Sequence, residues 1–218
     1  MSAKEIPGHL TGYTTDQLAE GSTNKYFKPL SVEGPLFDDI ETGGFAIQTT
    51  GPNAPDLEVL RDGIRLFAFA GTGGQPEQAF FDVHIPHDIK AGTTPTFHIH
   101  WTHNNAAPSG DVKWQLEVTA AQGYAAETFP ATVTISTTQT AGAQYAHMIT
   151  SDDDMALPAA LASSLEPDMK ILCRIFRDQT DAADTFEDDA FFLGADLHYE
   201  VGQIATTERN RPFTSAGF

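Results

Sequence analysis

Residues 112–120 alternate apolar and polar side chains without interruption, with Val112, Trp114, Leu116 and Val118 on the apolar phase. Successive side chains of a β-strand point to opposite faces, so one phase of such a segment can be buried while the other meets water. The alternation therefore predicts a half-buried strand.

Seven further segments carry strand-like patterns, and turn clusters separate them, for example at residues 71–74, 90–92 and 107–111. Within this block only Leu157 to Leu165 predicts a helix, with Pro158 in its first turn. The seven segments are residues 45–49, 64–70, 80–85, 96–103, 132–137, 169–176 and 190–201.

Eight strands with almost no helix predict an all-β domain, a jelly-roll-like antiparallel β-sandwich of about eight strands. The apolar phases of these strands should meet in one core between the two sheets. The expected core residues are Phe97, Ile99, Trp101, Val112, Trp114, Leu116, Val118, Ile171, Cys173, Ile175, Leu193 and Leu197.

The first 36 residues differ from the rest, being rich in Gly, Thr, Lys and Pro. They hold one predicted short helix, Asp16 to Glu20, and too few apolar residues to form a core of their own. We expect residues 1–36 to be an extended N-terminal attachment arm, residues 37–205 to form the jelly-roll domain, and residues 206–218 to be a C-terminal tail.

The charge balance is strongly acidic, with 30 acidic and 12 basic side chains among 218 residues and a formal net charge of -18. Such a surface repels phosphate backbones, so nucleic acid is not an expected partner. The N-terminus lacks the apolar core of a signal peptide, and no stretch approaches the roughly 18 apolar residues of a membrane span. We therefore expect synthesis in the cytoplasm and no membrane partner.

Histidines are the most prominent candidate functional residues. His98 and His100 share one face of a predicted strand, while His84 and His198 lie on the polar phases of two others. If these strands pair in one sheet, the four histidines and nearby carboxylates form a polar face. We predict that this face lies at the contact between subunits of a symmetric homotrimer, where histidine–carboxylate hydrogen bonds fix the register.

Two adjacent imidazoles also suit a metal ion, which leaves other interpretations open. Residues 92–100 resemble the first half of the first cupin motif, but Asn104 and Asn105 stand where cupins place a glutamate ligand. The alternatives are hydrogen bonding across strands, which the sequence favours, a structural or interface metal, and a cupin-like metal-dependent enzyme. We predict no catalytic residue, no metal ligand and no cofactor.

Other reactive residue types have simpler interpretations. The acidic stretches 152–154 and 178–189 do not match a calcium-binding loop and are interpreted as solvated loops. Cys173 lies in the apolar run 169–176, where a buried structural thiol is expected and not a nucleophile.

The N-terminal segment TDQLAEGSTNKYF, residues 15–27, resembles the Asp-x-Leu-x-Glu-Gly-x-x-Asn-x-Tyr-Phe segment of tailed-bacteriophage fibre and virion proteins. In those proteins the segment often joins an attachment region to the next part of the chain. The resemblance implies that Leu18, Asn24, Tyr26 and Phe27 belong to an attachment arm.

The region from about residue 80 to residue 201 resembles a family of phage structural proteins in the order of its landmarks. Together the two resemblances cover about 135 of the 218 residues. The landmarks are Pro86-His87, the strand His98 to Trp101, the strand Trp114 to Glu117, the strand Cys173 to Asp178, an acidic loop, and Asp196 to Glu200.

These resemblances imply a virion component without enzymatic activity. The first expectation is a capsid decoration or cement protein on the outer surface of the phage head, tied to the major capsid protein or other virion proteins by its arm. An acidic protein suits the outside of a DNA-filled shell better than its lumen. The alternative is a short tail-fibre or adaptor module that binds a host receptor.

Overall fold

A computed structural model describes residues 36–42, 53–73, 75–151 and 155–202. Within these ranges the chain forms ten strands and one short helix. They are β1 (Leu36–Thr42), β2 (Asp56–Arg61), β3 (Ile64–Phe69), β4 (Glu77–His84), β5 (Thr96–Thr102), β6 (Asp111–Gln122), β7 (Val133–Thr140), β8 (Met148–Ile149), α1 (Ala159–Ala162), β9 (Met169–Arg177) and β10 (Ala190–Val201).

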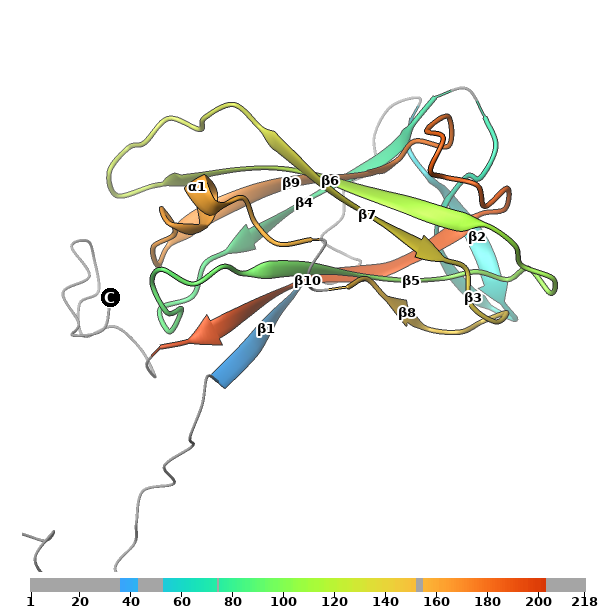
Figure 1. Ribbon diagram of the computed structural model, residues 1–218, viewed down its shortest axis with the longest axis horizontal. Helices are drawn as coiled ribbons and strands as arrows, with labels where there is room; N and C mark the ends of the chain where they lie inside the picture. Colours follow the sequence, from blue (N-terminus) through green and yellow to red (C-terminus); the bar gives the residue numbers. More distant parts are fainter. Residues whose placement is uncertain (1–35, 43–52, 74, 152–154, 203–218) are drawn as a thin grey trace, which may run out of the picture. The chain divides into compact units, whose positions relative to one another are not determined.

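Two antiparallel sheets form the two layers that Figure 1 shows. One sheet has the order β2-β3-β10-β5-β8, with β1 also paired to β10, and the other has the order β4-β9-β6-β7. We call them the six-stranded and the four-stranded sheet. The prediction of an all-β antiparallel sandwich is confirmed.

The strands from β3 to β10 pair in nested order: β3 with β10, β4 with β9, β5 with β8, and β6 with β7. This is one long hairpin, and its wrapping also places β10 beside β5 and β9 beside β6. Eight strands divided in this way between two sheets make a jelly roll. The strands β1 and β2 are additions to the six-stranded sheet.

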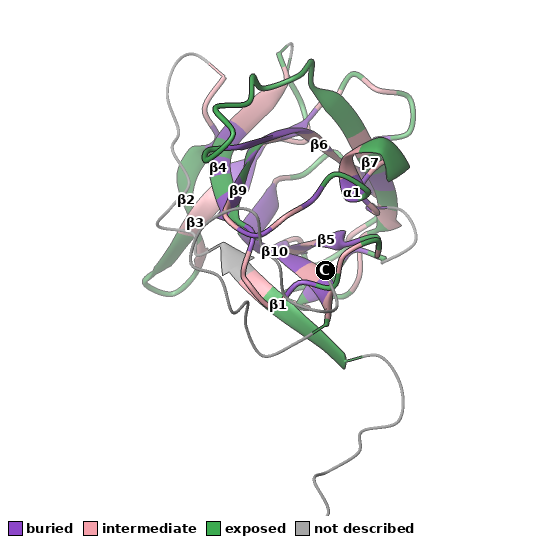
Figure 2. Ribbon diagram, turned by 90° about the vertical axis from the view of Figure 1, so that its left-hand side faces the viewer, coloured by how far each residue is buried: buried purple, intermediate pink, exposed green. Residues whose placement is uncertain are grey.

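The core lies between the two sheets, and the buried parts of β6, β9, β5 and β10 face each other in Figure 2. Eleven of the twelve predicted core residues are buried, including Trp114 and Trp101, both with no exposed surface. Burial of an apolar side chain contributes about 1.5 to 3 kcal/mol, so these strand faces hold the sandwich together.

Leu193 was predicted in the core but is 37% exposed. The register between β10 and β5 shifts between Phe192 and Gly194, which marks a β-bulge. Phe192 and Ala195 both face the core, so two residues stand between consecutive inward positions where a regular strand has one. The bulge changes the inward phase of β10, and Leu193 turns outward.

Several boundaries differ from the predictions. The sequence pattern did not indicate β1, β2 or β8, because their side chains are mostly exposed or the strand is only two residues long. The predicted helix shortens to α1, with Pro158 at its N-cap. The predicted strand at residues 45–49, the helix at 16–20, the arm up to residue 35 and the tail at 206–218 lie outside the described residues.

Arg177, at the end of β9, is fully buried on the inward phase of its strand. Its Nε and Nη2 atoms donate to the two carboxylate oxygens of Asp184 at 2.9 and 2.8 Å. Its remaining N–H groups donate to the carbonyl oxygens of Phe69, Phe186 and Asp188. All five guanidinium donors are thus used.

The acidic stretch 178–189 was interpreted as a solvated loop, which is wrong for Asp184. Its side chain is 1% exposed, pairs with Arg177, and also accepts the backbone N–H of Lys113 at 3.0 Å. The loop also passes close to Gly110, whose φ is +102° and where a Cβ atom would lie 2.4 Å from the carbonyl oxygen of Thr185. The loop is therefore packed onto the sandwich.

Candidate functional site

The pairing of β5 with β10 gathers polar side chains on the outward face of the six-stranded sheet. His98 lies opposite Asp196, and His198 lies opposite Thr96 on one side and Asp39 of β1 on the other. Residues directly opposite in a ladder point to the same face. We call the group Asp39, His98, His100, His147, Asp196 and His198 the histidine face.

Asp196 is the centre of one half of this face. Although it carries a carboxylate, Asp196 is only 8% exposed. Its Oδ1 lies 3.3 Å from Nδ1 of His98, and its Oδ2 lies 3.3 Å from Nε2 of His100. The contact with His100 is a hydrogen bond, whereas Oδ1 lies near the His98 ring without a hydrogen bond, so the cost of removing the carboxylate from water is offset in part.

A second histidine pair extends the face. Nδ1 of His100 lies 2.8 Å from Nε2 of His147, and the two ring centroids are 5.0 Å apart. When both rings are neutral, one nitrogen donates its proton and the other accepts. His147 comes from the segment before β8, so three parts of the chain meet here.

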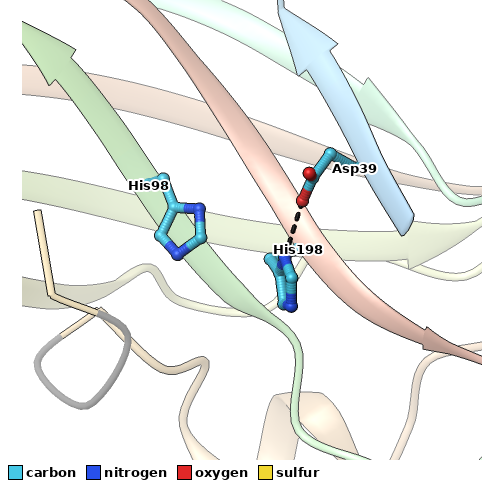
Figure 3. A group of neighbouring side chains, drawn as sticks. All are labelled: Asp39, His98 and His198. Atoms are coloured by element: carbon cyan, nitrogen blue, oxygen red, sulfur yellow. Dashed lines mark hydrogen bonds and ion pairs between the residues drawn. The ribbon is translucent and has the colours of Figure 1, made fainter. Parts of the chain in front are cut away.

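The other half of the face joins β1, β10 and β5, as Figure 3 shows. Nδ1 of His198 lies 2.7 Å from Oδ1 of Asp39, and the ring centroids of His98 and His198 are 5.3 Å apart. Asp39, His98 and His198 each offer one ligand atom, and these atoms all lie within 4.8 Å of one another. Imidazole nitrogens and a carboxylate oxygen are ligands that divalent transition metals accept.

His84 does not join this face, so the condition for a face of all four histidines, that their strands pair in one sheet, is not met. It lies on β4 of the four-stranded sheet, where Nε2 of His84 and Nε2 of His87 are each 3.1 Å from Oδ1 of Asp168. The jelly-roll topology puts β4 and β5 in different layers. Of the four predicted interface residues, the structure brings together His98, His100 and His198.

Asp39 and His147 were not among the predicted site residues. Asp39 precedes the first predicted strand, and His147 lies in a connection with no periodic pattern. The Phe37-Asp38-Asp39-Ile40 stretch offered one signal, because its apolar ends resemble a short edge strand.

His103, the third member of the His-x-His-x-x-His sequence, points away from the face: it is buried and its Nε2 lies 3.0 Å from the carbonyl oxygen of Gly142.

Other candidate groups have structural surroundings. Burial raises the pKa of the Cys173 thiol well above its ordinary value, which makes it a poor nucleophile and agrees with its predicted core position. An apolar groove of about 470 Å³ lies between β6, β7 and α1 and is lined by residues that include Val118, Val133 and Leu161. Neither feature adds a reactive side chain to the histidine face.

The predicted arm residues Leu18, Asn24, Tyr26 and Phe27 lie outside the described residues, as does the acidic stretch 152–154. Among the described residues, no helix has the length and apolar character needed to cross a membrane.

Comparisons with known structures give distant similarities. No protein-family profile and no curated protein matches the chain. The chain is similar to a structure of infectious bursal disease virus, Gx strain, at 9% identity and a TM-score of 0.36, covering 77% of this chain and 32% of that one. It is also similar to a structure of carbohydrate-binding modules from the β-sandwich superfamily, at 14% identity and a TM-score of 0.28, covering 78% of this chain and 57% of that one. This chain thus spans about a third of the first chain and just over half of the second. At these TM-scores neither similarity indicates its function.

Proposed function

We propose that this protein is a non-enzymatic structural component of a tailed-phage particle, a decoration or cement protein on the outer surface of the head. In this proposal the jelly roll associates as a symmetric homotrimer through the six-stranded sheet. The N-terminal arm attaches the trimer to the major capsid protein or to other virion proteins.

The observation that carries the proposal is where the exposed apolar side chains lie. On the four-stranded sheet such side chains are Phe80, Val133 and Leu172. The six-stranded sheet carries more of them, and exposed apolar surface of this kind favours contact with another protein. They are Leu36, Phe37, Leu57, Val59, Ile64, Ile149 and Leu193, each at least 37% exposed.

Two of these side chains border the histidine face directly. Phe37 stacks on the ring of His198, with centroids 4.9 Å apart and planes 20° from parallel. Ile149 lies opposite His100 in the β5–β8 ladder and therefore points to the same side. Half-buried imidazoles flanked by exposed apolar groups favour a surface that is covered in an assembly, where polar contacts fix the register.

The sequence supports a phage particle as the assembly in which this surface is covered. The resemblance of residues 15–27 and of residues 80–201 to phage virion proteins supports a position on a phage particle. The net charge of -18 supports an outer location, away from packaged DNA.

Sedimentation of the isolated protein is expected to show a trimer, and the double variant His98→Ala, His100→Ala is expected to weaken association about tenfold or more while the domain stays folded. The reason is that the variant removes both imidazole partners of Asp196 from the proposed contact surface. Analytical ultracentrifugation over a dilution series measures the association, and far-UV circular dichroism checks the fold.

The matched control is the double variant His84→Ala, His87→Ala at the end of β4 and in the turn that follows it, which should leave the trimer intact. If this control dissociates the trimer and the first variant does not, the contact lies on the other sheet. A wild-type protein that stays monomeric at high concentration would refute the trimer.

Deletion of residues 1–34 is expected to leave a folded domain that no longer attaches to particles. The described strands begin at Leu36, so the deletion removes none of them. Mixing wild-type or shortened protein with particles that lack it, followed by co-sedimentation, measures attachment. Full attachment of the shortened protein would show that the arm is dispensable.

The tail-fibre or adaptor alternative is favoured by one observation, the likeness of residues 15–27 to a segment of fibre proteins. Electron microscopy of purified particles labelled with an antibody to this protein separates the two. Label over the head supports the decoration protein, and label confined to the tail supports the adaptor.

A further inference from the structure

The Asp39, His98 and His198 group has the donor set of a metal site. Zn²⁺ accepts imidazole nitrogen at about 2.0 to 2.1 Å and carboxylate oxygen at about 2.0 to 2.2 Å, which in a tetrahedral site places ligand atoms about 3.3 Å apart. The three candidate atoms lie within 4.8 Å of one another without an ion. Small side-chain movements therefore suffice to close the site.

The scaffold restricts these side chains in a way that a random surface cluster does not. They come from three adjacent strands: β1 pairs with β10, and β10 pairs with β5. The side chains of His98 and His198 are 14% and 29% exposed, so surrounding atoms limit their rotamers. The side chain of Asp39 is 51% exposed and can turn to let an ion enter.

Asp196 supplies the supporting contact that metal-binding histidines commonly have. Its Oδ1 lies 3.3 Å from Nδ1 of His98. A carboxylate that contacts one ring nitrogen fixes the orientation of the imidazole and raises its basicity toward a metal on the other nitrogen. The candidate ligands and the carboxylate beside them thus both lie on the histidine face.

We propose that Asp39, His98 and His198 bind one divalent transition-metal ion, with Zn²⁺ as the preferred ion, and that this ion links β1 to β10 and β5. Three protein ligands leave a fourth position for water or for a donor from another chain. The site goes beyond the proposed function and does not depend on it.

The link matters because β1 is weakly held. Among the described strands β1 pairs with β10 alone, and its residues Leu36 and Phe37 are about half exposed. An ion bound by Asp39 and two histidines of the sheet adds its binding free energy to this single ladder. If the arm attaches the protein to a particle, as proposed above, the ion secures the strand from which the arm departs.

The test uses the full-length protein without a histidine tag, stripped of metal with a chelator and transferred to metal-free buffer. Titration calorimetry with Zn²⁺ is expected to show binding of one ion per chain. The Asp39→Asn variant and the double variant His98→Gln, His198→Gln are each expected to bind at least about tenfold more weakly. Co²⁺ serves as a spectroscopic probe, because ligation by protein side chains changes its visible absorption.

The double variant His84→Gln, His87→Gln is the matched control, since it removes the same number of histidines beside the carboxylate of Asp168. It should bind Zn²⁺ as the wild type does. Hydrogen exchange gives a second readout: Zn²⁺ should slow amide exchange in residues 36–42 of the wild type and of the control, but not of Asp39→Asn. The proposal is overturned if the wild type binds no Zn²⁺, or if removing His84 and His87 abolishes binding while removing His98 and His198 does not.

Discussion

Replacing Trp114 with alanine is expected to lower the free energy of unfolding by about 3 to 5 kcal/mol. Trp114 has no exposed surface and makes edge contacts with Phe69 and Trp101 at centroid distances of 5.2 and 6.2 Å. The substitution removes these contacts and leaves a cavity between the two sheets. Urea unfolding followed by far-UV circular dichroism, at fixed protein concentration, measures the change.

Two tryptophan-to-phenylalanine variants each lose the N–H group and part of the ring, so the difference between them reports the hydrogen bond. No described residue accepts a hydrogen bond from Nε1 of Trp114, so Trp114→Phe removes an unpaired donor and should cost less than about 2 kcal/mol. Nε1 of Trp101 donates to Oε1 of Gln139 at 2.7 Å, and Trp101→Phe breaks that bond. Trp101→Phe should therefore be the more destabilising of the two by about 1 kcal/mol. The opposite order would contradict the interpretation of Nε1 of Trp114 as an unpaired donor.

Replacing Asp184 with alanine is expected to destabilise the protein by about 3 to 5 kcal/mol, because the buried guanidinium of Arg177 loses the carboxylate that binds its Nε and Nη2 atoms. Neither side chain of this pair is more than 1% exposed. The same urea measurement applies, and limited proteolysis of the loop at residues 178–189 should report its release from the sandwich.

A surface pair between the same loop and β6 provides the control. Lys113 and Asp181 form an ion pair with partly exposed side chains, and this bond lowers the pKa of Asp181. Asp181→Asn should change the free energy of unfolding by less than about 1 kcal/mol. An effect of Asp184→Ala as small as that of Asp181→Asn would contradict the role assigned to the buried pair.

The double variant Arg177→Met, Asp184→Leu tests whether the loss of stability comes from an unpaired buried charge or from the lost hydrogen bonds of Arg177. Removing both charges avoids a lone buried charge, so the double variant should be more stable than Asp184→Ala. It should stay less stable than the wild type, because Arg177 also donates hydrogen bonds to the carbonyl oxygens of Phe69, Phe186 and Asp188, and the double variant loses them.

The sequence determined the two-layer architecture because strands buried on one face carry a period-2 pattern. Residues 112–120 show it without error, and Trp114, Leu116 and Val118 are in the core as predicted. The same pattern also indicated a buried arginine, which the sequence analysis did not predict. Arg177 follows Ile171, Cys173 and Ile175 on the inward phase of β9, and a buried arginine requires an acidic partner.

Only the tertiary structure decided which strands share a sheet. Alternation shows that a side chain faces outward. It does not show which of the two sheets the strand belongs to, because strand pairing joins segments that are far apart in the sequence. In the nested hairpin, His84 lies on the four-stranded sheet. The ring centroids of His98 and His198 are 5.3 Å apart, although 100 positions separate the two residues in the sequence. Asp39 and His147 join the histidine face for the same reason. The bulge at Leu193 depends on the local register of β10 against β5, which no single-strand pattern contains.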